Sequence, residues 1–303
     1  MKGLNDMSKK LLFVFNPMSG KAQIKSNLFR TVNKFSKNGF FVTVYPTQKE
    51  NDAYHIIKEN ASEFDLVVIA GGDGTLNEGI RALMAIKSHL RPKLGYIPTG
   101  TTNDFATSLK IPKNIPKAID NILLDQTLQC DVGLFNHKNF LYIAAFGAFT
   151  DVSYKTPQQT KNFWGHSAYI LEGLKMLPAL KPHHVRIEYD NTFIEDDFIF
   201  GMVSNTNSVG GFKLGKVFKA QLNDGLFEVV LIKNPRTLTE HQEIISSLLT
   251  QDLSSDSFYV FKTNKLRILS SEPIQWTLDG EFGGEYLDAN ICVEPSAITF
   301  LTK

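Results

Sequence analysis

The fold is decided by the stretch Asp65-Leu-Val-Val-Ile-Ala-Gly-Gly-Asp-Gly-Thr75, which continues as Leu-Asn-Glu78. Residues 65–70 form a mostly apolar run with the length of a buried strand. Glycines then permit a tight turn, and residues 76–89 carry the pattern of a helix. A helix N-terminus behind a glycine turn attracts phosphate, because its free N–H groups and its dipole both favour an anion. The stretch therefore predicts an α/β unit with a phosphate-binding turn.

The same alternation of apolar runs and amphipathic segments extends through the first 125 residues. Strands are expected at Leu11–Phe15, Phe40–Tyr45, 65–70 and Leu94–Pro98, and helices over residues 21–38, 52–60 and 76–89. Strands that alternate with helices indicate βαβ units, whose strands pair in parallel. The N-terminal part is therefore expected to be an α/β domain with a parallel sheet.

The texture of the chain changes after about residue 130, where short strand-like runs dominate. They are expected at Val132–Phe135, Phe140–Phe149, Val185–Tyr189, Phe193–Asn205, Leu226–Ile232, Phe258–Phe261, Leu266–Leu269, Ile274–Leu278 and Ile291–Val293. Helices are expected only near residues 163–177 and 237–250. Many short strands separated by turns indicate an antiparallel sandwich or barrel. The periodicity leaves open which domain the last strand, Ile298–Leu301, pairs with.

The composition excludes several classes of protein. The chain has 303 residues, and 32 Lys and Arg against 31 Asp and Glu give a net charge of +1. A dedicated nucleic-acid binder would carry a basic excess, so nucleic acid is not an expected partner. The longest apolar stretch, Phe140–Phe149, is half of the ~20 residues that a membrane helix needs. The first apolar run ends at Asn16-Pro17, too early for a signal peptide, so we expect a soluble cytoplasmic protein.

Two residue types have open roles. Cys130 and Cys292 have apolar neighbours and are expected to be buried thiols rather than disulfide partners or metal ligands. The chain has 23 phenylalanines against 2 tryptophans, and most of them must fill the core. A site for an apolar substrate would draw on the same residues, so the sequence leaves both uses of phenylalanine open.

Asp73 is the informative residue of the glycine turn. The turn is not a P-loop, because no Gly-Lys-Ser/Thr follows, and it departs from the dinucleotide G-x-G-x-x-G pattern at Asn77. A carboxylate in a phosphate-binding turn repels the ligand unless a cation lies between them, and Mg²⁺ would serve, directly or through water. The alternative is structural, since Thr75-Leu-Asn-Glu78 also fits a capping box. We favour the functional interpretation.

Two further turns follow predicted strands and open predicted helices. The first is Asn16-Pro-Met-Ser-Gly-Lys21, in which Ser19, Gly20 and Lys21 are suited to hold phosphate oxygens, and the second is Pro98-Thr-Gly-Thr-Thr-Asn-Asp-Phe105. Carboxyl ends of parallel strands lie at the same edge of a sheet, so all three turns should meet there and form a nucleotide cleft. The structural alternatives are a serine N-cap in the first turn and an Asn103 or Asp104 helix cap in the second.

These motifs resemble those of the diacylglycerol kinase catalytic family. The matching segments are Asn16-Pro-x-Ser-Gly20, Gly71-Gly-Asp-Gly-Thr-Leu-Asn-Glu78, Gly100-Thr-Thr-Asn-Asp-Phe-Ala106, Asp131-Val-Gly133, Gly210-Gly-Phe212, Asn223-Asp-Gly-Leu226 and Leu278-Asp-Gly-Glu281. The likeness is greatest to the soluble bacterial lipid kinases of that family, which are related to sphingosine kinases. The Gly-Gly-Asp-Gly turn alone is shared with NAD kinases and 6-phosphofructokinases, whereas the Thr-Asn-Asp-Phe turn narrows the likeness. The resemblance covers about residues 10 to 302.

The resemblance implies two domains. The first is an α/β nucleotide-binding catalytic domain of the NAD kinase and phosphofructokinase type, formed by residues 1–128 and by a last strand that returns to it, 296–303. The second is an all-β antiparallel sandwich for the lipid substrate, residues 129–295. Family members commonly form homodimers, and this remains open for the present chain.

The resemblance also assigns roles in Leu278-Asp-Gly-Glu281, which it places at the mouth of the cleft. Glu281 is implied to be the general base that takes the proton from the lipid hydroxyl, a role that suits a carboxylate whose pKa is raised toward neutrality by partial burial. Asp279 is expected to orient the loop. Without the resemblance, Asp279-Gly280 indicates only a hairpin turn.

A second, structural Mg²⁺ is implied near Asp224. Its ligands would be the Asp224 carboxylate and the backbone carbonyls of Gln221 and Leu226, and oxygen ligands suit this ion. From the residues alone, this segment indicates a hairpin turn. The chain departs from the family pattern at Phe218, where relatives usually carry proline, which puts the loop geometry in doubt. Lys161 lies where relatives have a basic residue that reaches toward the active site, and a solvated surface lysine is the alternative.

Together these inferences predict an ATP- and Mg²⁺-dependent lipid kinase that phosphorylates diacylglycerol or a similar lipid. Catalysis is assigned to Glu281, Asp73 and Asp104, of which the two aspartates organise Mg²⁺ and substrate. The nucleotide is assigned to Asn16, Pro17, Ser19, Gly20, Lys21, Thr47, Gly71, Gly72, Asp73, Gly74, Thr75, Leu76, Asn77, Glu78 and Thr101. The protein would visit the inner face of the membrane only transiently, since it has no predicted membrane segment and almost no net charge. The alternatives are a kinase of NAD or a sugar phosphate, and a non-catalytic nucleotide or lipid sensor on the same fold.

Overall fold

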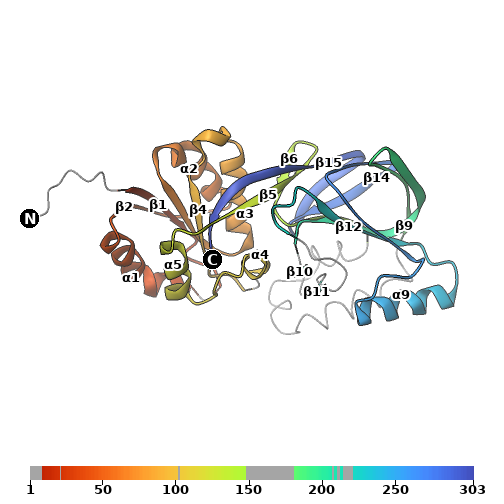
Figure 1. Ribbon diagram of the computed structural model, residues 1–303, viewed down its shortest axis with the longest axis horizontal. Helices are drawn as coiled ribbons and strands as arrows, with labels where there is room; N and C mark the ends of the chain where they lie inside the picture. The colour runs from red at the N-terminus through yellow and green to blue at the C-terminus, as the bar shows by residue number, and fades with distance from the viewer. Residues whose placement is uncertain are drawn as a thin grey trace, which may run out of the picture. The chain divides into compact units, whose positions relative to one another are not determined.

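The computed structural model describes residues 9–20, 22–101, 103–147, 181–206, 208–209, 212–213 and 221–303. The chain divides into two compact units, Met1–Cys130 with Ser296–Lys303, and Asp131–Pro295. Two strands pass from one unit into the other, β5 (Thr127–Phe135) and β15 (Glu281–Leu301) (Figure 1).

The first unit is built on a sheet of parallel strands. They are β1 (Lys9–Phe15), β2 (Phe40–Pro46), β3 (Leu66–Gly71) and β4 (Lys93–Pro98), in the order β4-β3-β1-β2. β1 pairs in parallel with both β2 and β3, and β3 pairs in parallel with β4. The end of β15 lies beside β4, where Phe300 pairs with Leu94 in parallel. This is the pairing that the family resemblance implied for the last strand.

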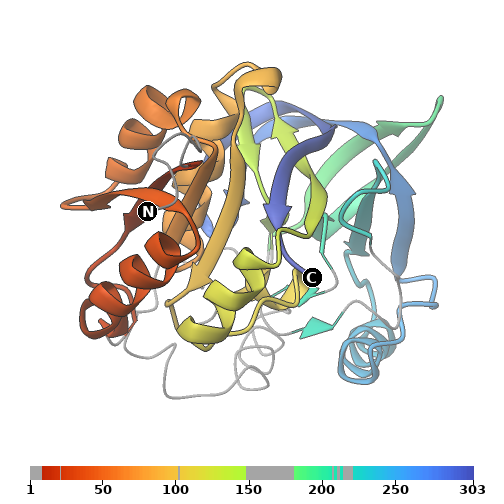
Figure 2. The same cartoon turned by 60° about the vertical axis from the view of Figure 1, so that its left-hand side comes forward.

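Helices cover both faces of this sheet. They are α1 (Gln23–Lys37), α2 (Asp52–Asn60), α3 (Asp73–Met84), α4 (Asp104–Ser108) and α5 (Ile115–Leu123), with short 3₁₀ turns at Ala61–Glu63 and Ser88–Leu90. α1 and α5 pack together on one face, and α2 and α3 pack together on the other (Figures 1 and 2). Because helices cover both sides, all six residues of β3 are buried, which explains the unbroken apolar run in the sequence.

The second unit consists mainly of antiparallel strands. Besides β5 and β15 they are β6 (Lys138–Phe140), β7 (Ile143–Gly147), β8 (His183–Tyr189), β9 (Thr192–Ser204), β10 (Ser208–Val209), β11 (Phe212–Lys213), β12 (Phe227–Lys233), β13 (Phe258–Thr263) and β14 (Lys265–Leu278). The strand order is β13-β12-β9-β7-β14-β15, β8 pairs with β9 and β14, and β10 pairs with β11 alone. One described helix, α9 (Leu238–Thr250), is held at its start by a capping box of Thr237 and Glu240.

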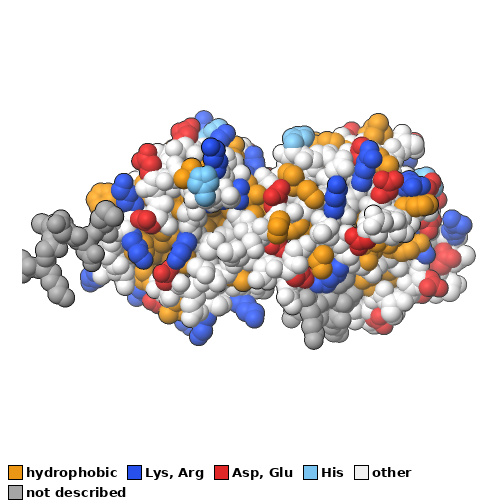
Figure 3. All heavy atoms as spheres, turned by 45° about the horizontal axis from the view of Figure 1, so that its top comes forward, with side chains coloured by type: hydrophobic (Ala, Val, Ile, Leu, Met, Phe, Trp, Pro, Cys, Tyr) orange, Lys and Arg blue, Asp and Glu red, His pale blue; other side chains and the backbone are white. Residues whose placement is uncertain are grey.

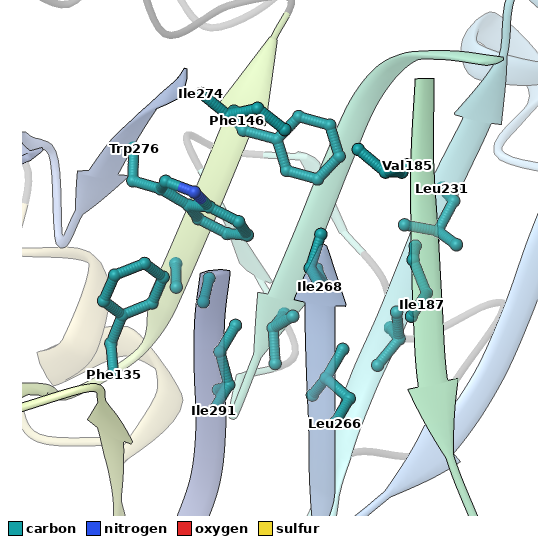
Figure 4. Close-up of a cluster of buried hydrophobic side chains, with 14 of the residues drawn as sticks. Phe135, Phe146, Val185, Ile187, Leu231, Leu266, Ile268, Ile274, Trp276 and Ile291 are labelled. Carbon is teal, nitrogen blue, oxygen red and sulfur yellow. The ribbon is translucent and has the colours of Figure 1, made fainter. Parts of the chain in front are cut away.

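Aromatic side chains fill the core of the second unit. Trp276 lies between Phe135 and Phe146, with ring centroids 4.8 and 5.0 Å away, and aliphatic side chains continue the cluster (Figure 4). A second cluster, on which Ile244 of α9 packs, contains Ile143, Val230 and further residues. The phenylalanines of this unit that are fully buried are Phe135, Phe140, Phe146, Phe198 and Phe227. These five phenylalanines of the second unit are therefore core residues.

Several sequence expectations need correction. The run Phe140–Phe149 was expected to be one strand, but β6 ends at Phe140 and β7 begins at Ile143, because a carboxylate takes up the backbone N–H groups between them. The strands expected separately within 265–278 form one strand, β14, and those within 291–301 belong to one strand, β15. Cys130 is buried as expected, whereas Cys292 is partly exposed. The helix expected near residues 163–177 lies outside the described residues.

The surface has a mixed character. Figure 3 shows Lys and Arg side chains interspersed with Asp and Glu over the face that it presents, with apolar side chains scattered between them. This distribution agrees with the balanced charge of the sequence. None of the helices in the described part of the chain has the length and apolar character to cross a membrane.

Candidate functional site

Three turns of the first unit meet at the carboxyl edge of its sheet, following β1, β3 and β4. The backbone N–H of Asn16 donates to the carbonyl of Ala70 at 2.9 Å, and that of Thr99 donates to the carbonyl of Gly71 at 2.9 Å. A Cβ on Gly100 would lie only 2.5 Å from the Cα of Gly72, so these two turns touch backbone to backbone. The structure thus brings together the turns that the sequence placed at one edge.

The turn after β1 is shaped by Asn16 and Gly20. The side-chain oxygen of Asn16 accepts a hydrogen bond from the N–H of Met18 at 2.9 Å. Gly20 has a φ of +55°, and a Cβ there would lie 2.2 Å from the carbonyl oxygen of Thr99, so only glycine fits. Ser19 is buried in this turn. Lys21, which the sequence assigned to the phosphates, lies outside the described residues.

Asp73 is the first residue of α3, behind Gly72 at the N-cap. Its Oδ2 accepts the backbone N–H of Asp104 at 3.3 Å. Its Oδ1 is buried and has no hydrogen-bond partner among the described residues, and the same is true of Oγ1 of Thr99. Burial raises the pKa of the Asp73 carboxyl, and the backbone N–H groups of residues 103–105 oppose this rise. A buried carboxylate oxygen without a partner fits a hard cation such as Mg²⁺, which prefers oxygen ligands.

The turn after β4 is held by Asn103, whose backbone has a φ of +53°. Its side-chain nitrogen donates to the carbonyl of Gly100 at 2.7 Å, and its side-chain oxygen accepts the N–H of Gly100 at 3.0 Å. Asn103 occupies the N-cap position of α4 but makes no side-chain cap bond, and Asp104 lies one residue inside the helix. The helix-cap interpretation of these two residues is therefore wrong. Thr102 lies outside the described residues.

Sequence reasoning missed Tyr96, a residue of β4 whose side chain contacts the end of β3. Its hydroxyl donates to the carbonyl of Gly71 at 3.1 Å, and the side chain is fully buried. Burial and the nearby charge of Asp73 raise the pKa of Tyr96 well above its ordinary value, so the hydroxyl keeps its proton and remains a donor. A tyrosine within the otherwise apolar run Leu94–Pro98 was the available signal.

Glu78 positions the start of α2 and does not cap α3. Its two carboxylate oxygens accept the backbone N–H groups of Asn51 at 3.0 Å and Ala53 at 3.1 Å, so it holds the start of α2. The capping-box alternative for Thr75 and Glu78 is wrong, because α3 already begins at Asp73. Burial raises the pKa of Glu78.

The remaining residues of the predicted nucleotide set differ in exposure. Thr47 is buried, and its N–H donates to the carbonyl of Phe15 at 2.9 Å, which fixes the turn after β2 beside β1. The Leu76 side chain is fully buried in the core, whereas Gly74 and Thr101 are exposed. Thr75 packs closely against Gly71, where an added Cβ would lie 2.5 Å from that of Thr75.

In the second unit, Asp279 organises the turn between β14 and β15. Its carboxylate accepts the backbone N–H groups of Leu141 at 2.6 Å, Tyr142 at 2.9 Å and Ile143 at 3.1 Å. Asp279 and Gly280 have φ values of +50° and +85°, as a two-residue hairpin turn requires. The expectation that Asp279 orients this loop agrees with these bonds. Glu281 opens β15 with an exposed side chain.

The Asp224 segment has an ion-pair network where the family resemblance implied a second Mg²⁺. Oδ2 of Asp224 lies 3.1 Å from Nζ of Lys262, which also lies 3.0 Å from Oε1 of Glu228. Oδ1 of Asp224 accepts the N–H of Leu226 at 3.1 Å. Both carboxylate oxygens of Asp224 thus have partners within the protein. The Asp224 carboxylate, the one side-chain ligand of the implied set of Gln221, Asp224 and Leu226, is therefore occupied by protein groups.

Glu228 is the fully buried carboxyl of this network. Burial raises its pKa to about 7, although the nearby Lys262 ammonium opposes the rise. Oε1 lies within ion-pair distance of Lys262, and neither carboxylate oxygen has a partner with hydrogen-bond geometry within the described ranges. Sequence reasoning missed both residues, since Glu228 lies within an apolar run and Lys262 is distant in sequence.

Two family models match the chain. That of the diacylglycerol kinase catalytic domain matches residues 10–135, and that of the YegS C-terminal NAD kinase beta sandwich-like domain matches residues 146–302. The family resemblance found in the motifs is thereby confirmed.

Curated relatives and solved structures agree with these matches. A diacylglycerol kinase of Bacillus subtilis (strain 168) is 38% identical over 91% of this chain and 91% of its own, and one of Staphylococcus epidermidis is 36% identical over 94% and 89%. The crystal structure of a candidate diacylglycerol kinase from Bacillus anthracis str. Sterne superimposes with a TM-score of 0.83 at 25% identity, covering 100% of this chain and 98% of that one. A second structure from that organism, with a TM-score of 0.77 at 23% identity over 97% of both chains, shows the same fold.

Proposed function

The chain belongs to the diacylglycerol kinase family and is a lipid kinase, and we propose that it transfers the γ-phosphoryl group of ATP to the hydroxyl of diacylglycerol. The observation that carries this proposal is the cluster of three glycine-containing turns around Asp73, whose buried Oδ1 has no partner among the described residues. Backbone N–H groups and a carboxylate at one helix N-terminus suit a nucleotide phosphate that arrives together with a cation.

The first unit is proposed to hold the nucleotide, and its parallel strand pairing supports this assignment. The proposed contacts are Asn16, Pro17, Ser19, Gly20, Lys21, Thr47, Gly71, Gly72, Asp73, Gly74, Thr75, Leu76, Asn77, Glu78 and Thr101. Within this set, Glu78 would act by positioning α2 and the turn that contains Thr47, since its oxygens are taken by backbone N–H groups. Leu76 would act through its backbone, since its side chain is in the core.

Asp73 is the proposed Mg²⁺ ligand, directly or through water, and Asp104 the residue that supports it. Mg²⁺ would supply neutralisation of the charge on the transferring phosphoryl oxygens. The bond between Asp73 Oδ2 and the Asp104 backbone fixes the carboxylate, so that Oδ1 keeps its orientation without a protein partner. This preorganisation avoids a reorganisation cost during transfer.

Glu281 is the proposed general base. It would accept the proton of the lipid hydroxyl while the hydroxyl oxygen bonds to the γ-phosphorus and the bond to the β-phosphate oxygen breaks, which releases ADP. Support comes from Asp279, whose three backbone hydrogen bonds fix the turn from which Glu281 projects. The exposed side chain of Phe282 next to it, 56% accessible, would offer an apolar contact for an acyl chain.

The wider setting is proposed on the same basis. Residues 1–128 with 296–303 would form the nucleotide-binding domain and residues 129–295 the lipid-substrate domain. The protein would act from the cytoplasm at the inner face of the membrane, bound there only transiently because its net charge is +1. A homodimer is proposed only because family members commonly form one.

A phosphorylation assay tests the function directly. Purified full-length protein is given [γ-³²P]ATP and Mg²⁺ with mixed micelles that contain diacylglycerol, with the same micelles lacking it, or with NAD. Label that extracts into organic solvent and migrates as phosphatidic acid supports the proposal. Label on NAD would instead support a kinase of a soluble metabolite, and nucleotide binding without turnover on any lipid would support a sensor.

Glu281→Gln tests the proposed base. Turnover should fall to background while binding of a non-hydrolysable ATP analogue, measured by calorimetry, stays within about twofold, because the residue acts on the lipid proton. Glu243→Gln, at an exposed glutamate on α9, is the matched control and should keep full activity. Unchanged turnover in Glu281→Gln would exclude this residue as the base.

A further inference from the structure

Lys262 bridges two carboxylates in the second unit that the proposed chemistry does not use. It lies on β13, directly opposite Glu228 on β12 in the strand register. Its Nζ lies 3.0 Å from Oε1 of Glu228 and 3.1 Å from Oδ2 of Asp224. One ammonium group therefore joins the sheet to residues 221–226, the segment that leads into β12, which we call the entry segment.

The burial of the two carboxylates means that they need a nearby positive charge. Glu228 is fully buried, and Asp224 is largely buried, with 20% of its side chain accessible. Two carboxylates close to one cation would repel each other without it, and a buried charge whose partner is removed is strongly destabilising. Lys262 itself keeps 31% of its side chain accessible, so its long stem reaches in from the surface.

Further contacts within the protein hold the entry segment. The N–H of Gly225 donates to the carboxylate of Asp131 at 2.7 Å, and the N–H of Asp131 donates to the carbonyl of Leu222 at 2.7 Å. The second oxygen of Asp224 is taken by the N–H of Leu226. Both oxygens of the Asp224 carboxylate, the side-chain ligand implied for a divalent ion, are thus engaged within the protein.

We propose that the Lys262 ammonium is the built-in cation of the entry segment, so that this segment is held in place without a divalent metal. Lys262 is a positioning residue: it neutralises Asp224 and Glu228 together and fixes the segment against β12 and β13. The inference concerns the stability of the second unit and stands independently of the proposed kinase reaction.

Thermal unfolding of the full chain tests the proposal, with Mg²⁺ alone as the probe and no nucleotide present. The background variant is Asp73→Asn, which removes the cation site proposed in the first unit. Its melting temperature should be the same within about 1 °C in EDTA and in excess Mg²⁺, because mass action stabilises only a protein that binds the ion. A rise of several degrees in Mg²⁺ that Asp224→Asn abolishes would overturn the proposal.

Lys262→Met should lower the melting temperature by roughly 5 °C or more, since it leaves two buried carboxylates without their cation. Lys265→Met, at an exposed lysine two residues past β13, is the matched control and should change it by less than about 1 °C. Adding Glu228→Gln to Lys262→Met should recover part of the loss, because the uncompensated charge is removed. A Lys262→Met protein as stable as its parent would also overturn the proposal. If Lys262→Met does not fold, the comparison of EDTA with Mg²⁺ in the Asp73→Asn background decides.

Discussion

Oδ2 of Asp73 accepts the backbone N–H of Asp104 at 3.3 Å and so ties the first residue of α3 to the first residue of α4. The two residues lie in turns that follow neighbouring parallel strands, β3 and β4. One carboxylate oxygen therefore serves the architecture, and the other, buried and without a partner among the described residues, is left for a ligand. A single side chain links the shape of the site to its chemistry.

Asp73→Asn should separate these two roles. The amide oxygen still accepts the Asp104 N–H, and a buried charge is removed, so the melting temperature should not fall. Turnover should drop by about 10²–10³-fold, the usual effect of losing one electrostatic contribution to a transition state. Kinase assays and thermal unfolding measure both effects, with Asp256→Asn, an exposed carboxylate, as the control. A variant that keeps its activity would show that Asp73 does not bind the cation.

Gly20→Ala should damage the nucleotide site through the backbone. The added methyl group would lie 2.2 Å from the carbonyl oxygen of Thr99, and the φ of +55° disfavours any side chain. Because the turns would have to separate, kcat/KM for ATP should fall by roughly 10²-fold. Gly39→Ala is the matched control, because its φ is +87° but nothing lies within 4 Å of the added atom. It should cost about 1 kcal/mol of stability and leave the kinetics unchanged.

Glu78→Gln should weaken nucleotide binding without removing a ligand of the phosphates. The amide replaces one acceptor by a donor, which then faces a backbone N–H of α2. We expect a loss of about 1–2 kcal/mol in the free energy of unfolding and a rise in KM for ATP with little change in kcat. An equal fall in kcat and kcat/KM would indicate a direct catalytic contact instead.

In the Asp279→Asn variant, the turn that carries the proposed base should unfold more easily than in the parent. The aspartate accepts three backbone N–H groups, and an amide with one acceptor oxygen cannot satisfy all of them. Urea denaturation should show a loss of about 2–3 kcal/mol. Glu281→Gln provides the comparison, since it should reduce turnover but not stability. Equal stability of the Asp279→Asn protein would mean that these bonds contribute little.

The pair of His184 and Asp197 predicts a small pH dependence of stability. The hydrogen bond from the His184 ring to the Asp197 carboxylate, 2.8 Å long, raises the pKa of His184 above its ordinary value of 6.5. A raised histidine pKa stabilises the fold fully below about 6.5, and this contribution is lost as the pH rises through the folded value. The difference in stability between the parent and His184→Ala should thus be larger at pH 5.5 than at pH 8.5. Because the pair is exposed, high salt should reduce it.

The sequence by itself determined the features that depend on neighbouring residues. The apolar run before Gly71 predicts β3, the alternation around it predicts the first unit, and Asp279-Gly280 predicts a two-residue turn, all from local backbone preferences and burial. The family could also be recognised from the sequence, because Gly-Gly-Asp-Gly and Thr-Asn-Asp-Phe are each an unbroken run of residues.

Only the tertiary structure decided which polar groups face one another across the chain. Tyr96 reaches the carbonyl of Gly71, Glu78 holds the start of α2, and Lys262 forms an ion pair with Asp224. These partners are 25, 27 and 38 positions apart. The physical reason is that a buried polar group must find a partner wherever the fold brings one, and periodicity along the chain carries no information about which distant residue that is.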